Sequence, residues 1–143
     1  MNRSTRDEYP LAAYPGRSID GLVQLGGYEY FNPLINNGNF SASQVSGRAE
    51  VVCFGERRQS SDMPRRLESM GRRPGSMSDL LELRVQYPEL SLADPIVALD
   101  AVYINAERQR YIGCIFEFAG EPNLGVIWER EAWSPRYRFL VVA

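Results

Sequence analysis

The chain of 143 residues contains neither histidine nor lysine, so all 16 of its basic residues are arginines. Histidine is the usual general base near neutral pH and a common zinc ligand. Lysine forms Schiff bases and contacts phosphates in P-loops. The composition excludes these mechanisms within the chain. We therefore expect a protein that is not an enzyme, with no catalytic residues, no metal and no cofactor.

Long apolar runs are also missing. No run approaches the roughly 20 residues that a helix needs to span a membrane, and residues 1–8 lack the apolar core of a secretory signal. The net charge of -2 does not predict that the molecule as a whole binds a polyanion. We expect a cytoplasmic protein without a membrane or nucleic acid partner, and the oligomeric state stays open.

Cysteine is scarce. Cys53 and Cys114 each lie in an apolar run, and no CxxC pair exists. Because free cysteine behaves as a small buried hydrophobe, we expect two buried thiols, with a disulfide as the alternative. The spacing offers no structural zinc site.

The rest of the composition, 44% apolar and 24% charged, is typical of one globular domain. Residues 1–18 contain two X-Pro turns and are expected to form a flexible tail or a strap across the surface. Residues 19–143 are expected to form a single domain. Within it, residues 19–47 mix apolar, glycine and asparagine positions and predict irregular structure with one or two short strands.

Helical and strand periods then follow one another. Residues 48–54 are rich in β-branched side chains and predict a strand. Met63, Leu67 and Met70 share one face of a helix over residues 60–70. A second helix is predicted to start at Ser76, with Asp79 completing a capping box, and to stop before Pro88.

After residue 95 the apolar period changes from helical to alternating. Strands are predicted over residues 97–104, 111–118, 126–128 and 137–142, with short turns between them. This pattern favours an antiparallel meander. A strand followed by two helices and an antiparallel sheet gives an α+β fold.

Three segments carry a resemblance to a known fold: Gly71-Arg72-Arg73-Pro74 with the helix that follows it, Pro95-Ile96-Val97-Ala98-Leu99, and Arg138-Phe139-Leu140-Val141-Val142. They resemble the C-type-lectin-like fold in its compact bacterial forms. Residues 60–143 also resemble a group of small uncharacterised bacterial proteins. Several proteins with this ending are the variable proteins of diversity-generating retroelements. That resemblance implies ligand contacts at the exposed positions between Trp128 and Tyr137.

Glu121-Pro122-Asn123 resembles the tripeptide that helps ligate calcium in sugar-binding C-type lectins. Those lectins also use a later Trp-Asn-Asp, but here Trp133 is followed by Ser134 and Pro135. Calcium needs six to eight oxygen ligands. We therefore expect a proline-containing turn at residues 121–123 and no calcium–sugar site.

The last twenty residues are the main candidate site. Trp128 is expected in the core, and Trp133 either plugs the core or contacts a ligand. Tryptophan and arginine are enriched at binding hot spots. We expect non-catalytic binding of a protein or other macromolecule by a surface built from residues 117–123 and 128–137. The expected ligand-binding residues are Glu117, Phe118, Glu129, Arg130, Glu131, Trp133, Ser134 and Arg136.

The arginine-rich residues 57–73 are the rival site. Such a patch predicts an anion-binding role for Arg65, Arg66, Arg72 and Arg73. The corresponding function is that of a small inhibitor or accessory protein that binds a nucleoprotein or acidic partner. One version of this hypothesis makes it a phage-encoded protein. The alternative is a solvated helix face, because Asp62 and Glu68 stand four residues before Arg66 and Arg72.

Overall fold

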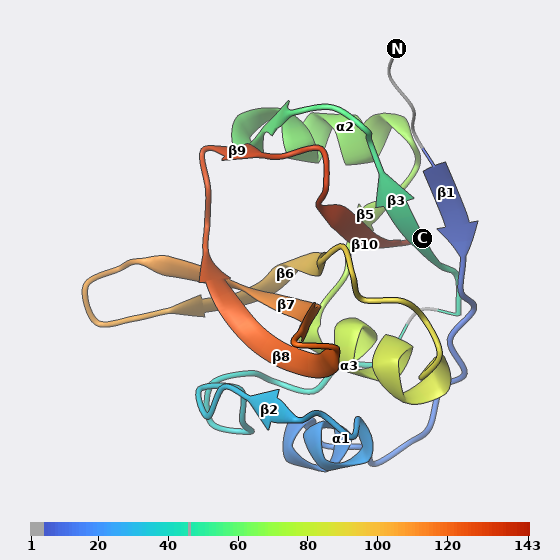
Figure 1. The fold of residues 1–143 in the computed structure, drawn as a ribbon, viewed down its shortest axis with the longest axis vertical. Helices are drawn as coiled ribbons and strands as arrows, with labels where there is room; N and C mark the ends of the chain where they lie inside the picture. The colour runs from blue at the N-terminus through green and yellow to red at the C-terminus, as the bar shows by residue number, and fades with distance from the viewer. Residues whose placement is uncertain (1–4, 46) are drawn as a thin grey trace.

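The structure is a computed structural model that describes residues 5–45 and 47–143 (Figure 1). The described residues form a mixed α+β fold with one large sheet and three short helices. The strands of the large sheet are β1 (Thr5–Glu8), β2 (Tyr30–Phe31), β3 (Ala49–Cys53), β5 (Arg73–Pro74), β6 (Ile96–Ile104), β7 (Arg110–Phe118), β8 (Glu121–Trp128) and β10 (Arg138–Val142). The remaining elements are the paired strands β4 (Arg58–Gln59) and β9 (Ala132–Trp133), the helices α1 (Ile19–Leu25), α2 (Met63–Ser69) and α3 (Met77–Gln86), and a 3-10 turn at Ser60–Asp62.

The large sheet has the strand order β1-β3-β10-β6-β7-β8-β2, with β5 also paired to β10. Strands β6, β7 and β8 form the predicted antiparallel meander. The last strand does not continue it, because β10 lies between β3 and β6, antiparallel to the first and parallel to the second. Residues 139–142 are apolar and buried on both faces, so this strand needs a central place in the sheet.

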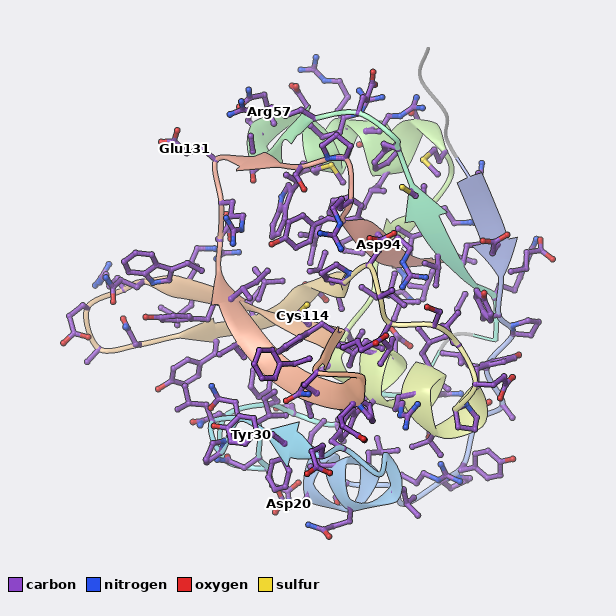
Figure 2. The ribbon with its side chains drawn as sticks, viewed as in Figure 1. Asp20, Tyr30, Arg57, Asp94, Cys114 and Glu131 are labelled. Carbon is purple, nitrogen blue, oxygen red and sulfur yellow. The ribbon has the colours of Figure 1, made fainter. Side chains whose placement is uncertain are left out.

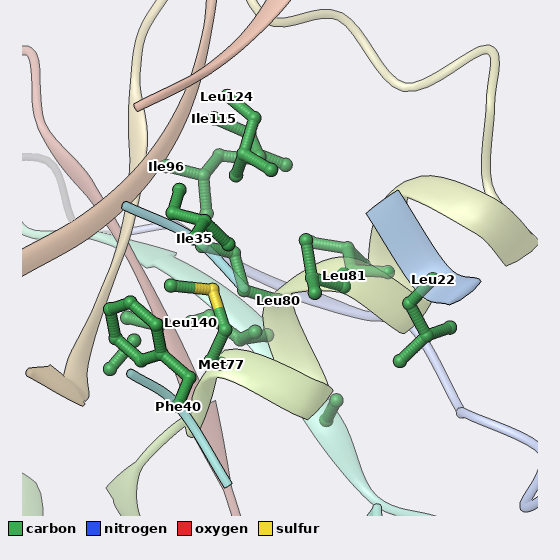
Figure 3. Packing of buried hydrophobic residues seen from close by; sticks show 14 of the residues in the cluster. Leu22, Ile35, Phe40, Met77, Leu80, Leu81, Ile96, Ile115, Leu124 and Leu140 are labelled. Atoms are coloured by element: carbon green, nitrogen blue, oxygen red, sulfur yellow. The ribbon is translucent and has the colours of Figure 1, made fainter. Parts of the chain in front are cut away.

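One apolar core lies on each face of the sheet. Helices α1 and α3 cover one face, where Leu22, Leu80 and Leu81 pack with strand residues such as Ile96 and Ile115 (Figure 3). Helix α2 and β9 cover the other face over residues that include Met63, Leu67, Val97, Ile112, Trp133 and Phe139. Burying a leucine or isoleucine fully contributes about 1.5–3 kcal/mol. The two cores together hold the helices on opposite sides of the sheet.

The two predicted helices after residue 60 are confirmed. In α3, the Ser76 hydroxyl accepts from the amide of Asp79 at 3.2 Å, and the Asp79 carboxylate accepts from the amide of Ser76 at 2.9 Å. This capping box satisfies two donors at the helix start. Helix α2 buries Met63 and Leu67 as predicted. Gly71 follows it with φ at +69°, a conformation that glycine adopts without strain.

The prediction of irregular structure over residues 19–47 is wrong for its first part. Ser18 caps α1 by accepting from the amide of Gly21 at 3.0 Å, and Ile19, Leu22 and Val23 are buried. Their spacing is helical, but the helix has only seven residues. A helix this short is stabilised mainly by packing, here against α3.

The flexible-tail prediction over residues 1–18 fails for the described residues 5–18, which form the strap that was its alternative. Strand β1 pairs antiparallel with β3, and Leu11 is 3% exposed. The carboxylate of Glu50 in β3 accepts two hydrogen bonds from Arg6, both at 2.9 Å, and one from Arg72. These bonds lower the pKa of the buried Glu50, Arg6 being the larger cause. Residues 1–4 lie outside the described residues.

Glu121-Pro122-Asn123 is the start of β8 and not the expected turn, which is made by Ala119 and Gly120 at φ +52° and +80°. Proline fits here because its nitrogen points away from β7, so no ladder hydrogen bond is lost. Strand β8 is therefore longer than the predicted 126–128 and carries Trp128 at its far end.

Candidate protein-binding groove

The two tryptophans take environments opposite to those favoured by the sequence. Trp133 is 1% exposed, whereas Trp128 is 58% exposed. The Trp133 ring packs edge-on against Tyr137 and Phe139, with centroids 5.0 and 5.8 Å away. Trp128 shares a face of β8 with the half-buried Val126, as expected, but it lies beyond the core. The core prediction for Trp128 is wrong, and Trp133 is buried in the core as one of its two predicted alternatives.

A groove lies between α2 and the distal end of β6, β7 and β8. It consists of two adjoining hollows of about 410 and 660 Å³ that share Ser60, Arg110 and Glu129. The first hollow is next to α2, and the second is next to the β6–β7 turn and the segment between β8 and β9. We call the two hollows together the α2 groove.

The floor of the first hollow is apolar. Met63 and Leu67 from α2 face Ile112 of β7, with Leu99 of β6 and Trp133 of β9 completing the lining. These five residues come from four elements, and the strand residues among them point to the same face of the sheet because side chains alternate between the faces along every strand. Such a floor can bury an apolar side chain of a ligand.

An ion pair stands between the two hollows. The Arg110 Nε donates to the Glu129 carboxylate at 2.7 Å, and the backbone amide of Glu129 donates to the Arg110 carbonyl at 2.9 Å. The two side chains are 49% and 36% exposed. Exposed pairs of this kind contribute only about 0–1 kcal/mol. A ligand carboxylate or guanidinium can therefore displace one partner at small cost.

The groove brings together parts of both sequence-predicted sites. Glu129, Arg130 and Glu131 line the second hollow, and Arg72 and Arg73 line the first. The sequence predicted these two segments as alternative sites. They meet because β9 returns across the end of the sheet and pairs with β4, just before α2.

Of the four predicted anion-binding residues, Arg65 and Arg66 do not join the groove lining. Arg65 is exposed, and the Arg66 guanidinium stacks 5.4 Å from the ring centre of Phe54. Arg72 is held by the buried carboxylate of Glu50. The four predicted arginines therefore do not form one anion site.

Glu117 and Phe118 lie at the opposite end of β7, and they do not join the groove. The amide of Glu117 donates to the carbonyl of Leu92 at 3.0 Å, and Phe118 is 70% exposed. An eight-residue strand rises roughly 3.3 Å per residue, so β8 separates these residues from Trp128 by about 23 Å.

Ser134 and Arg136 form a third location. The Arg136 Nε donates to Asp94 at 3.0 Å and its Nη2 to the carbonyl of Ala93 at 3.1 Å. Figure 2 shows Asp94 well apart from Glu131. The predicted single surface over residues 117–123 and 128–137 is therefore wrong, because the β8 strand and the β9 crossover divide it.

Sequence reasoning missed Gln59, Ser60, Ser61, Arg108, Gln109 and Arg110, which line the second hollow. Arg108, Gln109 and Arg110 approach Glu129 through the register of β7 and β8, in which Tyr111 stands opposite Trp128. Residues 59–61 approach this segment through the pairing of β4 with β9. The alternating pattern of residues 111–118 indicated the strand but not its register. No local signal in the sequence marks these six residues as neighbours of residues 128–131.

The groups that could support chemistry or metal binding are few. Both cysteines are free, and burial raises the pKa of the Cys114 thiol to about 12. Cys53 is half-buried, 3.4 Å from the carbonyl of Pro135. Across residues 5–45 and 47–143, no cluster of three or more acidic or cysteine side chains could hold a metal ion. The helices of the described chain include none long and apolar enough to cross a membrane.

Comparison with protein-family models, with curated proteins and with solved structures found no match.

Proposed function

We propose that this protein is a non-catalytic binding domain that holds a segment of a partner protein in the α2 groove. The observation that carries the proposal is the composition of the groove. An apolar floor of residues from four elements is bordered by charged side chains from three separate parts of the chain. Interfaces commonly combine an apolar centre with a polar rim.

The groove residues have different roles in this proposal. Leu99, the half-buried residue of the floor, takes an apolar side chain of the partner, and it packs with the buried Leu67 and Ile112. Arg110 and Glu129 exchange their mutual ion pair for pairs with the partner, which is inexpensive because both are exposed. Arg130 offers a planar guanidinium to a carboxylate, and Glu131 sets charge specificity.

Binding is favoured over catalysis by the chemistry of the groove. Its lining contains no cysteine, and the chain has no histidine or lysine. Glu129 is bound to Arg110. Paired carboxylates can perform glycosidase chemistry when they face each other across a cleft. Here the Glu129 carboxylate is engaged in the ion pair with Arg110.

The element order supports a C-type-lectin-like fold as the finer part of the proposal. Strand β3 precedes α2 and α3, the antiparallel β6, β7 and β8 follow, and β10 returns beside β3. If the chain is also a variable protein of a diversity-generating retroelement, substitutions among related strains will concentrate at Glu129, Arg130, Glu131, Ser134 and Arg136. Substitutions spread evenly along the gene would contradict this.

The alternative, an inhibitor or accessory protein that grips a nucleoprotein or acidic partner through residues 57–73, has less support. Arg72 is bound to Glu50, and Arg66 stacks on Phe54. Only the contribution of Arg72 and Arg73 to the groove rim remains. A partner captured in the presence of nuclease but lost on changing Arg65 alone would favour this alternative.

Two matched double variants test the groove. Arg110→Ala with Glu129→Ala removes the groove ion pair, and Asp94→Ala with Arg136→Ala removes an exposed pair elsewhere, at 3.0 Å. We expect a protein partner captured by affinity purification to bind the first variant at least about tenfold more weakly, a change of roughly 1.4 kcal/mol. The second variant should bind like the unmodified chain. If instead only the Asp94→Ala with Arg136→Ala variant loses binding, the binding site lies at residues 134–136.

A further inference from the structure

Strand β8 is a sheet edge that β2 covers over only part of its length. Strand β2 pairs in parallel with Asn123 and Leu124, and the amide of Asn32 donates to the carbonyl of Leu124 at 3.0 Å. Residues 125–128 have β7 on one side. In the described chain, no strand pairs with their other side (Figure 1).

The unpaired backbone groups of this half belong to Val126 and Trp128. Along an antiparallel strand, every second residue bonds to one neighbour and the residues between face the other way. The amide of Glu129 donates to the carbonyl of Arg110 in β7, whereas the carbonyl of Leu124 accepts from the amide of Asn32, directly after β2. Val126 and Trp128 are in step with Leu124, so their N–H and C=O groups point to the open edge. The described residues supply no hydrogen bond to them.

This half of the edge lacks the features that prevent strand pairing. Natural sheet edges carry charges, prolines or bulges that keep other strands away. Residues 125–128 are Gly-Val-Ile-Trp, and the charge and proline of β8, Glu121 and Pro122, lie in the half next to β2. Trp128 leaves 58% of its surface exposed beside the edge. The free half of β8 is therefore a template for an added strand.

The free edge leads directly into the α2 groove. Trp128 lines the second hollow together with Arg108 and Arg130. In the described chain neither arginine forms an ion pair. Outside the Arg110–Glu129 pair, the second hollow is lined by these two arginines and by one carboxylate, that of Glu131. The Arg130 guanidinium lies 5.6 Å from the ring centre of Tyr137. This end of the groove thus has an excess of positive charge.

We infer that the occupant of the α2 groove is an extended segment of the partner protein that adds to β8 as a strand. Its backbone bonds to Val126 and Trp128, an apolar side chain covers the Trp128 ring, and an acidic residue further along pairs with Arg108 or Arg130. This inference rests on the proposed function and names the class of ligand. Backbone pairing provides affinity, and the two flanking contacts provide specificity.

Proline at position 126 isolates the backbone contribution. Val126→Pro removes the outward N–H, and proline is accepted on a sheet edge where that N–H faces solvent. Val126→Ala keeps the N–H and is the matched control. A phage-displayed library of random peptides is selected on the unmodified chain, and the enriched peptides are synthesised and titrated against both variants. Circular dichroism and thermal melting establish that each variant is folded.

We expect enriched peptides with an apolar and an acidic residue that bind the Val126→Ala variant normally and the Val126→Pro variant at least about tenfold more weakly. Hydrogen exchange at the Val126 and Trp128 amides should slow on binding. Peptides that bind a folded Val126→Pro variant equally well, yet lose affinity for the Arg110→Ala with Glu129→Ala variant, would overturn strand addition and leave the proposed groove function intact.

Two other outcomes also overturn the inference. If enriched peptides bind both folded variants and are indifferent to Arg110 and Glu129, the proposed function fails as well. If the chain alone dimerises in analytical ultracentrifugation and Val126→Pro abolishes the dimer, the edge takes a second copy of the chain and not a partner strand.

Discussion

The ring of Trp133 stands perpendicular to the ring of Phe139, at an interplanar angle of 90° with centroids 5.8 Å apart. Phe139 belongs to the central strand β10, and Trp133 belongs to the short strand β9. This contact fastens the crossover between β8 and β10 onto the core. The crossover in turn positions Glu129, Arg130 and Glu131 beside the 3-10 turn that precedes α2.

The first prediction concerns the two tryptophans. Trp133→Ala should lower the free energy of unfolding by about 3–5 kcal/mol, because it leaves a large cavity in the core. Trp128→Ala, the matched control, should change it by less than about 1 kcal/mol, since 58% of that side chain is already exposed. Urea denaturation of both variants measures the difference. Equal losses would show that Trp133 does not fasten the crossover.

The second prediction concerns the pH dependence of the Glu50 network. Arg6 and Arg72 hold the pKa of Glu50 below its ordinary value of 4.5 in the folded protein. The ion pairs therefore contribute stability fully above the unfolded pKa, and this contribution is lost as the pH falls through the folded pKa. Glu50→Gln should lower stability at neutral pH by about 1–3 kcal/mol, because the largely buried Arg72 and the exposed Arg6 both lose a charged acceptor.

The same variant should flatten the loss of stability on the acid side of 4.5, measured by urea denaturation over a pH series. Glu129→Gln is the control, because that carboxylate has one exposed arginine partner. It should shift stability by less than about 1 kcal/mol and keep the acid limb. If the loss of stability at acid pH is unchanged in Glu50→Gln, other carboxylates cause the acid sensitivity.

The third prediction tests the open edge of β8 without any ligand. The amides of Val126 and Trp128 should exchange with solvent quickly, because no acceptor protects them. The amides of Ile127 and Glu129 point to β7 and should exchange more slowly, by about tenfold or more. Hydrogen exchange followed by NMR resolves the four amides. Protection of all four would mean that another group already covers the edge.

Much of the fold could be predicted from local pattern. The helical spacing of Met63 and Leu67 and the capping box of Ser76 and Asp79 each specify a structure within a few residues, and both are confirmed. The alternation after residue 95 gave the meander of β6, β7 and β8. These signals work because one side of each element must be buried.

The site was harder to predict because its parts are far apart in sequence. Arg110 and Glu129 are partners 19 residues apart, and Ser60 bonds to the carbonyl of Arg130 across 70 residues. The alternation correctly put Val126 and Trp128 on one face of β8. It could not show that the core ends between them, since the depth of the core depends on which strands stand beside β8 and how far they extend.

The sequence by itself determined the strand β3, the helices α2 and α3, the strands β6 and β7, the absence of histidine and lysine chemistry, and the apolar character of the terminal strand. Only the tertiary structure decided that Trp133 is buried and Trp128 exposed, and that the arginine-rich and C-terminal segments meet at one groove. Periodicity is a property of neighbours along the chain. Burial of a strand end and the meeting of distant segments depend on register and on the central position of β10, which arise only when both faces of the sheet are packed.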